Sequence, residues 1–405
     1  MASVLVALFA VAVLGAAPAQ ADTPAGTEWT QQTVPVAGND WLTVTYGGGL
    51  FVTVAARGSS NQVMTSPDGV TWTASSVTGA NDIYFRGITY GNGRFVAVGV
   101  QQFGPNQVMV STDGVSWSLY GPADREWSSV AYGAGVFVAV SRTNLGVGSV
   151  MTSSDGATWT VAPAAQDNNW NSVVYAGGQF VAVAEDGANR VMTSPDGVTW
   201  TLRTAASASG WYSVTYGDGR YVATAWTGTD RVMTSPDGIT WSAQSGFEAA
   251  QWPSVTFGDG LFVAVSFDAS GDRVMTSPDG VTWTGRPAAS AKQWMAVTYG
   301  NGTFVSVARF AGTSAVMTSS AIVDPVLPMA EWLVIHQALP MPASDTCADV
   351  TDSDVAWGTG LTGGWTRGWE PWVESGNPDA PRGGWACIRT LVNTGGNRWL
   401  IGGSA

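Results

Sequence analysis

Residues 211–241 read WYSVTYGDGRYVATAWTGTDRVMTSPDGITW, and the pattern within them predicts the fold. It holds four short runs rich in β-branched and aromatic residues, at 213–216, 221–224, 232–234 and around Trp241. Gly, Asp and Pro separate these runs, which is typical of short β-strands joined by tight turns. No apolar residues recur at helical spacing over ten residues or more. The stretch therefore predicts a four-stranded unit.

The same unit recurs seven times along the chain. Its opening phrase, Trp-x-x-Val-x-Tyr-Gly, returns at intervals of 41 to 44 residues, and a Val-Met-Thr-Ser phrase or a close variant follows each time. Four-stranded units of about 40–45 residues in series are the signature of β-propellers. We therefore predict an all-β fold, a seven-bladed β-propeller of four-stranded blades. The units begin at Trp41, Phe85, Trp127, Trp170, Trp211, Trp252 and Trp294.

The two ends of the repeat region predict how the ring closes. Residues 28–31 contain Trp29 and resemble a fourth strand without the three strands that should precede it. Residues 316–319 form a third strand without its successor. Because pairing the two ends removes exposed strand edges, we expect the Trp29 strand to complete the last blade.

A second repeated phrase, Ser-x-Asp-Gly-x-Thr-Trp, predicts a tight turn between the third and fourth strands. Gly accepts positive φ, and the Asp carboxylate accepts backbone N–H bonds within such a turn. We expect the Trp that follows, the Met of each Val-Met-Thr-Ser phrase, and the Trp that opens each unit to pack in the core. The six structural turn aspartates are Asp68, Asp113, Asp155, Asp196, Asp237 and Asp279.

These turns make residues 28–320 resemble the Asp-box family, also called bacterial neuraminidase repeats, which includes sialidases and sortilin-type receptors. The family pattern is Ser-x-Asp-x-Gly-x-Thr-Trp, and this chain is one residue shorter between Asp and Gly. The resemblance implies that the box is a structural turn far from any catalytic face. The Arg-Ile-Pro phrase of sialidases is absent. The resemblance therefore implies a non-catalytic member.

The remaining segments predict export and a small second module. Residues 1–21 carry no charge, have an apolar core and end in Ala-Gln-Ala, which predicts a secretory signal peptide. We then expect the propeller at 22–320, a linker at 321–330 and a Trp-rich module at 331–405. In an exported protein, Cys347 and Cys387 of this module predict a disulfide. The expected location is secreted and extracellular, with association with the cell envelope left open.

The formal net charge of −13 argues against nucleic acid or anionic membranes as partners. The single histidine, His336, lies outside the repeats and argues against histidine-based catalysis or metal sites. After the N-terminal segment, no stretch of the sequence is long and apolar enough to predict a membrane span. We expect no cofactor and no metal site, and we expect a monomer.

Function is expected where the repeats differ, in the loops between the second and third and between the fourth and first strands, which share one face. We predict that this face binds a glycan, peptide or protein without catalysis. The alternatives are a glycoside hydrolase, sialidase-like or using two carboxylates such as Glu185 and Asp268, and a purely structural cell-envelope protein. The candidate ligand-binding residues are Arg57, Arg142, Glu185, Trp226, Asp268 and Arg309.

Overall fold

A computed structural model describes residues 24–321 apart from 58–61, 81–82, 102–106, 123–124, 143–149, 246–248 and 269–271, together with four short strands between 368 and 402. The described residues form strands and turns and contain no helix. The chain divides into two compact units, one of residues 21–322 and one that contains 323–405. The first of these units is the propeller.

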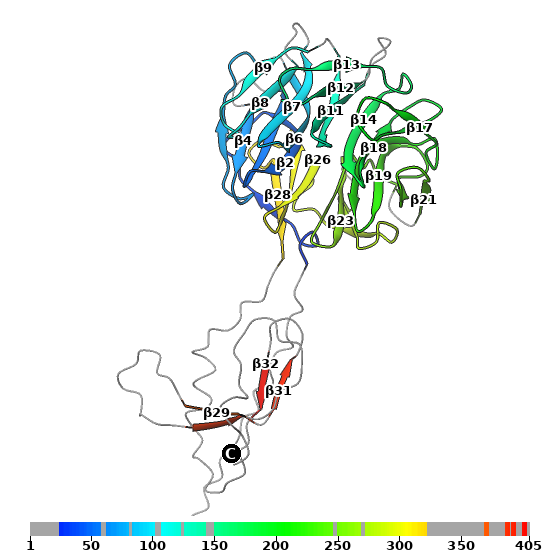
Figure 1. The fold of residues 1–405 in the computed structure, drawn as a ribbon. Helices are drawn as coiled ribbons and strands as arrows, with labels where there is room; N and C mark the ends of the chain where they lie inside the picture. Colours follow the sequence, from blue (N-terminus) through cyan, green and yellow to red (C-terminus); the bar gives the residue numbers. More distant parts are fainter. Residues whose placement is uncertain are drawn as a thin grey trace, which may run out of the picture. The chain divides into compact units, whose positions relative to one another are not determined.

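Seven four-stranded antiparallel sheets form the ring predicted from the repeats (Figure 1). The first strands of neighbouring blades contact one another around the axis. The blades are β2 (Asp40–Gly47), β3 (Leu50–Arg57), β4 (Val63–Ser66), β5 (Thr73–Ser75); β6 (Ile83–Gly91), β7 (Arg94–Gln101), β8 (Val108–Ser111), β9 (Ser118–Tyr120); β10 (Trp127–Gly133), β11 (Val136–Ser141), β12 (Val150–Ser153), β13 (Thr160–Ala162); β14 (Trp170–Ala176), β15 (Gln179–Ala184), β16 (Val191–Ser194), β17 (Thr201–Arg203); β18 (Gly210–Gly217), β19 (Arg220–Thr227), β20 (Val232–Ser235), β21 (Ser242–Gln244); β22 (Ser254–Gly258), β23 (Leu261–Val265), β24 (Val274–Ser277), β25 (Thr284–Arg286); and β26 (Gln293–Gly300), β27 (Thr303–Arg309), β28 (Val316–Ser320), β1 (Thr30–Gln32).

The predicted ring closure is confirmed, because β1 pairs antiparallel with β28 and completes the seventh blade. The contact extends beyond the strand. The backbone N–H of Gly26 donates to Ser319 Oγ at 2.7 Å, and Trp29 Nε1 donates to the Gly26 carbonyl at 3.1 Å. The same two bonds join Ser66, Gly69 and Trp72 in the first blade. The seventh blade therefore has a turn of the same kind, split between the two ends of the propeller and lacking the aspartate.

Local sequence explains the strands and their burial. In the second blade the turn between the first two strands is Asn92-Gly93, with φ of 48° and 71°, which are the paired positive values of a type I′ hairpin. The Trp residues that open the units are 0–1% exposed, and the seven Met residues are equally buried. The prediction that both sets pack in the core is confirmed.

A glycine at the end of the first strand sets the distance between neighbouring blades. A Cβ on Gly133 would lie 1.9 Å from the ring of Tyr175 in the next blade. The same contact closes the ring, because a Cβ on Gly300 of the seventh blade would lie 2.1 Å from the ring of Tyr46 in the first. At these two seams a Cβ would overlap the neighbouring tyrosine ring, so glycine is needed at Gly133 and Gly300.

The aspartates of the six intact turns hold backbone groups, as predicted. Asp196 Oδ1 accepts the N–H of Val198 at 2.8 Å and of Thr199 at 2.8 Å, and Ser194 Oγ accepts the N–H of Gly197 at 2.8 Å. Gly197 has a φ of 78°, in the region that favours glycine. Each carboxylate thus stabilises the turn in which it lies by accepting backbone N–H bonds.

These turns make stability depend on pH. The backbone hydrogen bonds from Ser116 and then Val115 lower the pKa of Asp113 from 3.8 to about 2, and those from Thr158 and Ala157 lower the pKa of Asp155 to about 2. A carboxyl with a lowered folded-state pKa stabilises the fold above its unfolded pKa and loses that contribution as pH falls through the folded value. We expect the melting temperature to fall between about pH 4 and pH 2, and to fall less steeply in an Asp113→Asn/Asp155→Asn variant. Thermal unfolding of both proteins across this range checks the prediction, and identical slopes would contradict it.

The second unit contains two antiparallel hairpins. One pairs β29 (Gly368–Pro371) with β30 (Trp385–Ile388), and the other pairs β31 (Thr390–Asn393) with β32 (Trp399–Gly402). Cys387 lies on β30, opposite Trp369 in the register, whereas Cys347 lies outside the described residues. The disulfide therefore stays a prediction, as does the signal peptide at 1–21, which also lies outside them.

Candidate binding site at the channel mouth

The first strands of all seven blades surround a cavity of about 150 Å³ on the propeller axis. Each blade contributes two consecutive residues that follow its opening aromatic residue. The first of the two is different in all seven blades, whereas the second is small in every blade. The seven variable residues are Leu42, Arg86, Ser128, Asn171, Tyr212, Pro253 and Met295.

A backbone irregularity accompanies these variable residues. The pairing of the first and second strands skips one position in six blades, as between Trp127 and Ser129 and between Trp170 and Ser172. The skipped residue is the variable one, here Ser128 or Asn171. A β-bulge re-aims a side chain and commonly occurs at barrel rims and next to active sites. The repeat thus places one non-repeated side chain of each blade at the axis.

The serines that directly follow some of these variable residues form hydrogen bonds to the next blade. Ser129 Oγ accepts the backbone N–H of Val173 in the next blade at 3.2 Å. Ser172, Ser213 and Ser254 make the same bond to the following blades at 3.1–3.2 Å. These bonds join the first strands of neighbouring blades around the cavity.

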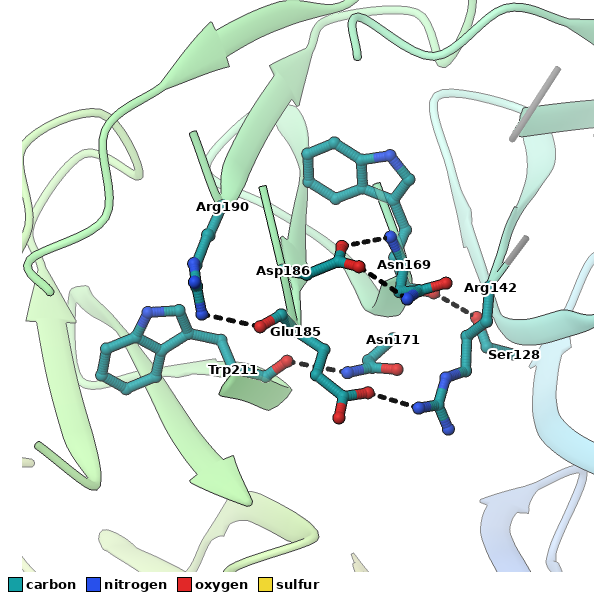
Figure 2. A network of polar contacts seen from close by, with 9 residues as sticks. Ser128, Arg142, Asn169, Asn171, Glu185, Asp186, Arg190 and Trp211 are labelled. Carbon is teal, nitrogen blue, oxygen red and sulfur yellow. Dashed lines mark hydrogen bonds and ion pairs between the residues drawn. The ribbon is translucent and has the colours of Figure 1, made fainter. Parts of the chain in front are cut away.

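An ion pair spans two blades at the mouth of the channel (Figure 2). The Arg142 guanidinium at the end of the third blade's second strand pairs with the Glu185 carboxylate of the fourth. Arg190 fixes the Glu185 backbone by donating to its carbonyl at 2.6 Å. The side chains of Arg142 and Glu185 are 24% and 30% exposed, so solvent and ligands reach both. The sequence placed these two candidates on one face, and the structure brings them into contact.

An aromatic patch continues from this ion pair. The Arg142 guanidinium lies 5.8 Å from the centre of the Tyr212 ring. Tyr212 contacts Trp226 with ring centres 5.2 Å apart, and Trp226 contacts Phe267 at 4.9 Å. All three rings are partly exposed. They offer apolar, amphipathic contact area beside charged and hydrogen-bonding groups, which is the composition of binding hot spots.

Asp268 and Arg309, two further predicted residues, and the neighbouring Asp186 have structural partners. Asp268 Oδ2 accepts the backbone N–H of Gln251 at 2.9 Å, and Asp186 accepts two bonds from Asn169 at 2.7 Å (Figure 2). Both carboxylates therefore order loops. Arg309 pairs with the buried Asp40 at 3.4 Å across the seam between the last and first blades. For Arg57 the structure describes the backbone, at the end of β3.

Sequence reasoning missed Arg86, Asn171 and Tyr212, the variable residues most relevant to a ligand. Their signal was present, because each occupies the one position of an otherwise repeated phrase that differs in every unit. Function was expected in the loops, whereas this position directly follows the opening aromatic residue of each unit, which was expected in the core. Among the described residues, no group of three or more His, Cys, Asp or Glu side chains gathers to hold a metal ion. The described part of the chain also has no helix long and apolar enough to cross a membrane.

Fold and site define this protein as a seven-bladed β-propeller with a polar axial channel. No family model matches the chain, and no curated protein matches it. Among solved structures it resembles a catalytically inactive virginiamycin B lyase from Staphylococcus aureus with quinupristin, at 8% identity over 73% of this chain and 99% of that one, with a TM-score of 0.62. It also resembles YCF48 from Cyanidioschyzon merolae (16% identity, 72% and 98% coverage, TM-score 0.54) and YCF48 bound to D1 peptide (17%, 74% and 99%, TM-score 0.55). These likenesses show the fold alone.

Proposed function

We propose that this protein is a secreted, non-catalytic member of the Asp-box propellers that binds a glycan, peptide or protein at the mouth of its channel. The observation that carries the proposal is the concentration of non-repeated side chains there. Duplication made the blades alike, yet the axial position after each opening aromatic residue differs in all seven. The peptide bound by YCF48 supports a peptide as one of the three ligand classes.

The arrangement of carboxylates favours binding over glycoside hydrolysis. A two-carboxylate hydrolase needs a pair of acidic groups that both face the scissile bond. Glu185 is paired with Arg142, and Asp268 accepts a backbone N–H, so each has a structural partner already. The aromatic patch and the ion pair instead form a fixed surface, which costs little conformational entropy when a ligand binds.

Removal of the Trp226 side chain, which contacts both Tyr212 and Phe267, tests this function. Residues 22–405 are screened on glycan and peptide arrays, and the affinity of the best ligand is measured for the wild type and for Trp226→Ala. We expect the variant to bind at least about tenfold more weakly with an unchanged melting temperature, because Trp hot spots contribute about 2 kcal/mol or more. Equal affinities would contradict the proposal. Turnover of chromogenic glycosides that is lost in Glu185→Gln would replace it with hydrolysis.

A further inference from the structure

A second position of the repeat differs between blades and lies next to the first. It is the fifth residue after the aromatic residue near the start of each second strand, such as Trp226 after Tyr221. Six residue types occupy this position in the seven blades: Ala56, Val100, Arg142, Glu185, Trp226, Phe267 and Arg309. Trp226 contacts Tyr212, the variable residue of the first strand in the same blade. Both variable positions therefore contribute to the aromatic patch and its ion pair.

The aromatic patch carries two polar hydrogens that the protein does not use. Ten described tryptophans donate their indole N–H to a backbone carbonyl, as Trp211 does to Ser207 at 3.2 Å. In contrast, the indole N–H of Trp226 and the hydroxyl of Tyr212 form no hydrogen bond with a described residue. Both side chains are partly exposed, and neither atom belongs to the buried polar atoms that lack a partner. A ligand can therefore reach both donors.

The charged groups beside the rings neutralise each other. Arg142 pairs with Glu185, so the patch offers no net charge to a ligand. The guanidinium has five N–H groups and keeps some of them for a neutral acceptor, whereas the Glu185 carboxylate already accepts from it. The accessible groups of the patch therefore mainly donate, and they match an uncharged ligand that is rich in acceptors.

We propose that the aromatic patch binds a proline-rich peptide segment in the polyproline II conformation. This inference rests on the proposed function and chooses among its ligand classes. The backbone carbonyls of such a segment have no internal hydrogen bonds, and proline has no N–H, so the segment supplies acceptors for Trp226 and Tyr212. Its apolar rings pack on aromatic side chains, and its conformation is formed before binding, which lowers the entropic cost. A neutral glycan matches less well, because its hydroxyls donate as well as accept.

The arrangement of the rings fits a segment of this kind. The interplanar angle is 34° between Tyr212 and Trp226 and 49° between Trp226 and Phe267, so the three rings do not form one flat platform. A polyproline II helix has three residues per turn, so its successive side chains face different directions. The steps from Arg142 to Tyr212, to Trp226 and to Phe267 are 5.8, 5.2 and 4.9 Å. At a rise of about 3.1 Å per residue, about five residues are enough to cover the patch.

Two labelled peptides test the choice of ligand. Binding of a capped proline decapeptide to residues 22–405 is measured by fluorescence anisotropy, beside a capped Gly-Ser decapeptide of the same length and charge. We expect the proline peptide to bind at least about tenfold more tightly, because the Gly-Ser peptide lacks the rings and must lose its conformational freedom. Its affinity should change by less than about threefold between about 0.05 M and 0.5 M salt, since no net charge is paired.

Variants that keep an aromatic ring and remove a donor assign the binding to the patch. Tyr212→Phe and Trp226→Phe are each expected to weaken binding by about threefold or more, the net worth of a hydrogen bond. Their melting temperatures should equal that of the wild type, because neither donor has a partner within the described protein. Tyr120→Phe, on the outermost strand of the second blade, is the matched control and should bind like the wild type.

Three results would overturn the inference. They are equal binding of the two decapeptides, loss of proline-peptide binding in 0.5 M salt, and an affinity that neither Tyr212→Phe nor Trp226→Phe changes. If the arrays give a glycan that depends on Trp226 while the proline decapeptide does not bind, the inference fails and the proposed function stands. If neither the arrays nor the decapeptides give binding, both fail.

Discussion

Deletion of residues 22–36 should open the propeller ring. The deletion removes β1, the Gly26 bond to Ser319 and the buried side chains of Ala25 and Val34. We expect it to destabilise the fold by at least about 3 kcal/mol, because core contacts and buried hydrogen bonds are lost together. The melting temperature should fall by about 5 °C or more. The edge of β28 is then exposed, and exposed strand edges promote aggregation.

The matched control is the protein that begins at Asp22, which keeps every described contact of the N-terminal segment. Calorimetry compares the melting temperatures of the two proteins, and light scattering compares their aggregation. A deleted protein that stays monomeric and melts at the same temperature as the control would show that β1 does not close the ring.

Gly300→Val should disrupt the same closure from the other side. Its Cβ would lie 2.1 Å from Cγ and 2.6 Å from Cβ of Tyr46, and the second of these atoms cannot move without the backbone. Overpacking of this kind forces neighbouring strands apart, so we expect a loss of about 3 kcal/mol or more in the free energy of unfolding. Denaturant unfolding at fixed temperature measures the change.

The fourth blade supplies the control for this variant. It has Ala176 where most blades have glycine, so this seam already accommodates a methyl group. Ala176→Gly is expected to change stability by less than about 1 kcal/mol, through the loss of a small side chain. Equal effects of Gly300→Val and Ala176→Gly would contradict the steric account.

The sequence was sufficient to predict the fold, because the length of the repeat indicates one blade and the number of repeats indicates the number of blades. The spacing of the opening Trp residues predicted the number of blades, and the unmatched strands at the two ends predicted the pairing of β1 with β28. The split seventh turn escaped detection for a physical reason. Its hydrogen bonds need only a serine, a glycine and a tryptophan, and these lie at residues 319, 26 and 29, without the aspartate that marks the other six.

The candidate site was predicted only in part. Variation between the repeats predicted that Arg142, Glu185 and Trp226 share one face, and the structure pairs Arg142 with Glu185 and packs Trp226 against Tyr212. It did not predict which carboxylates would order loops, because the bond from Gln251 to Asp268 depends on how two loops of different length meet. Nor did it predict the axial role of Arg86 and Asn171. A bulge re-aims the side chain there, and a bulge is defined by how two strands pair, which the sequence of one strand does not show.

We expect a ligand to bind at the channel mouth and not on the opposite face of the ring. Affinity for one ligand, measured by calorimetry in parallel for three proteins, tests this most directly. The proteins are the wild type, a Tyr212→Ala/Trp226→Ala variant of the mouth, and a Val198→Ala/Ile239→Ala variant of two exposed apolar side chains on the opposite face. Only the mouth variant is expected to lose affinity, by about 100-fold or more if each aromatic contributes as a hot spot. Loss in the Val198→Ala/Ile239→Ala variant with an intact mouth variant would contradict it.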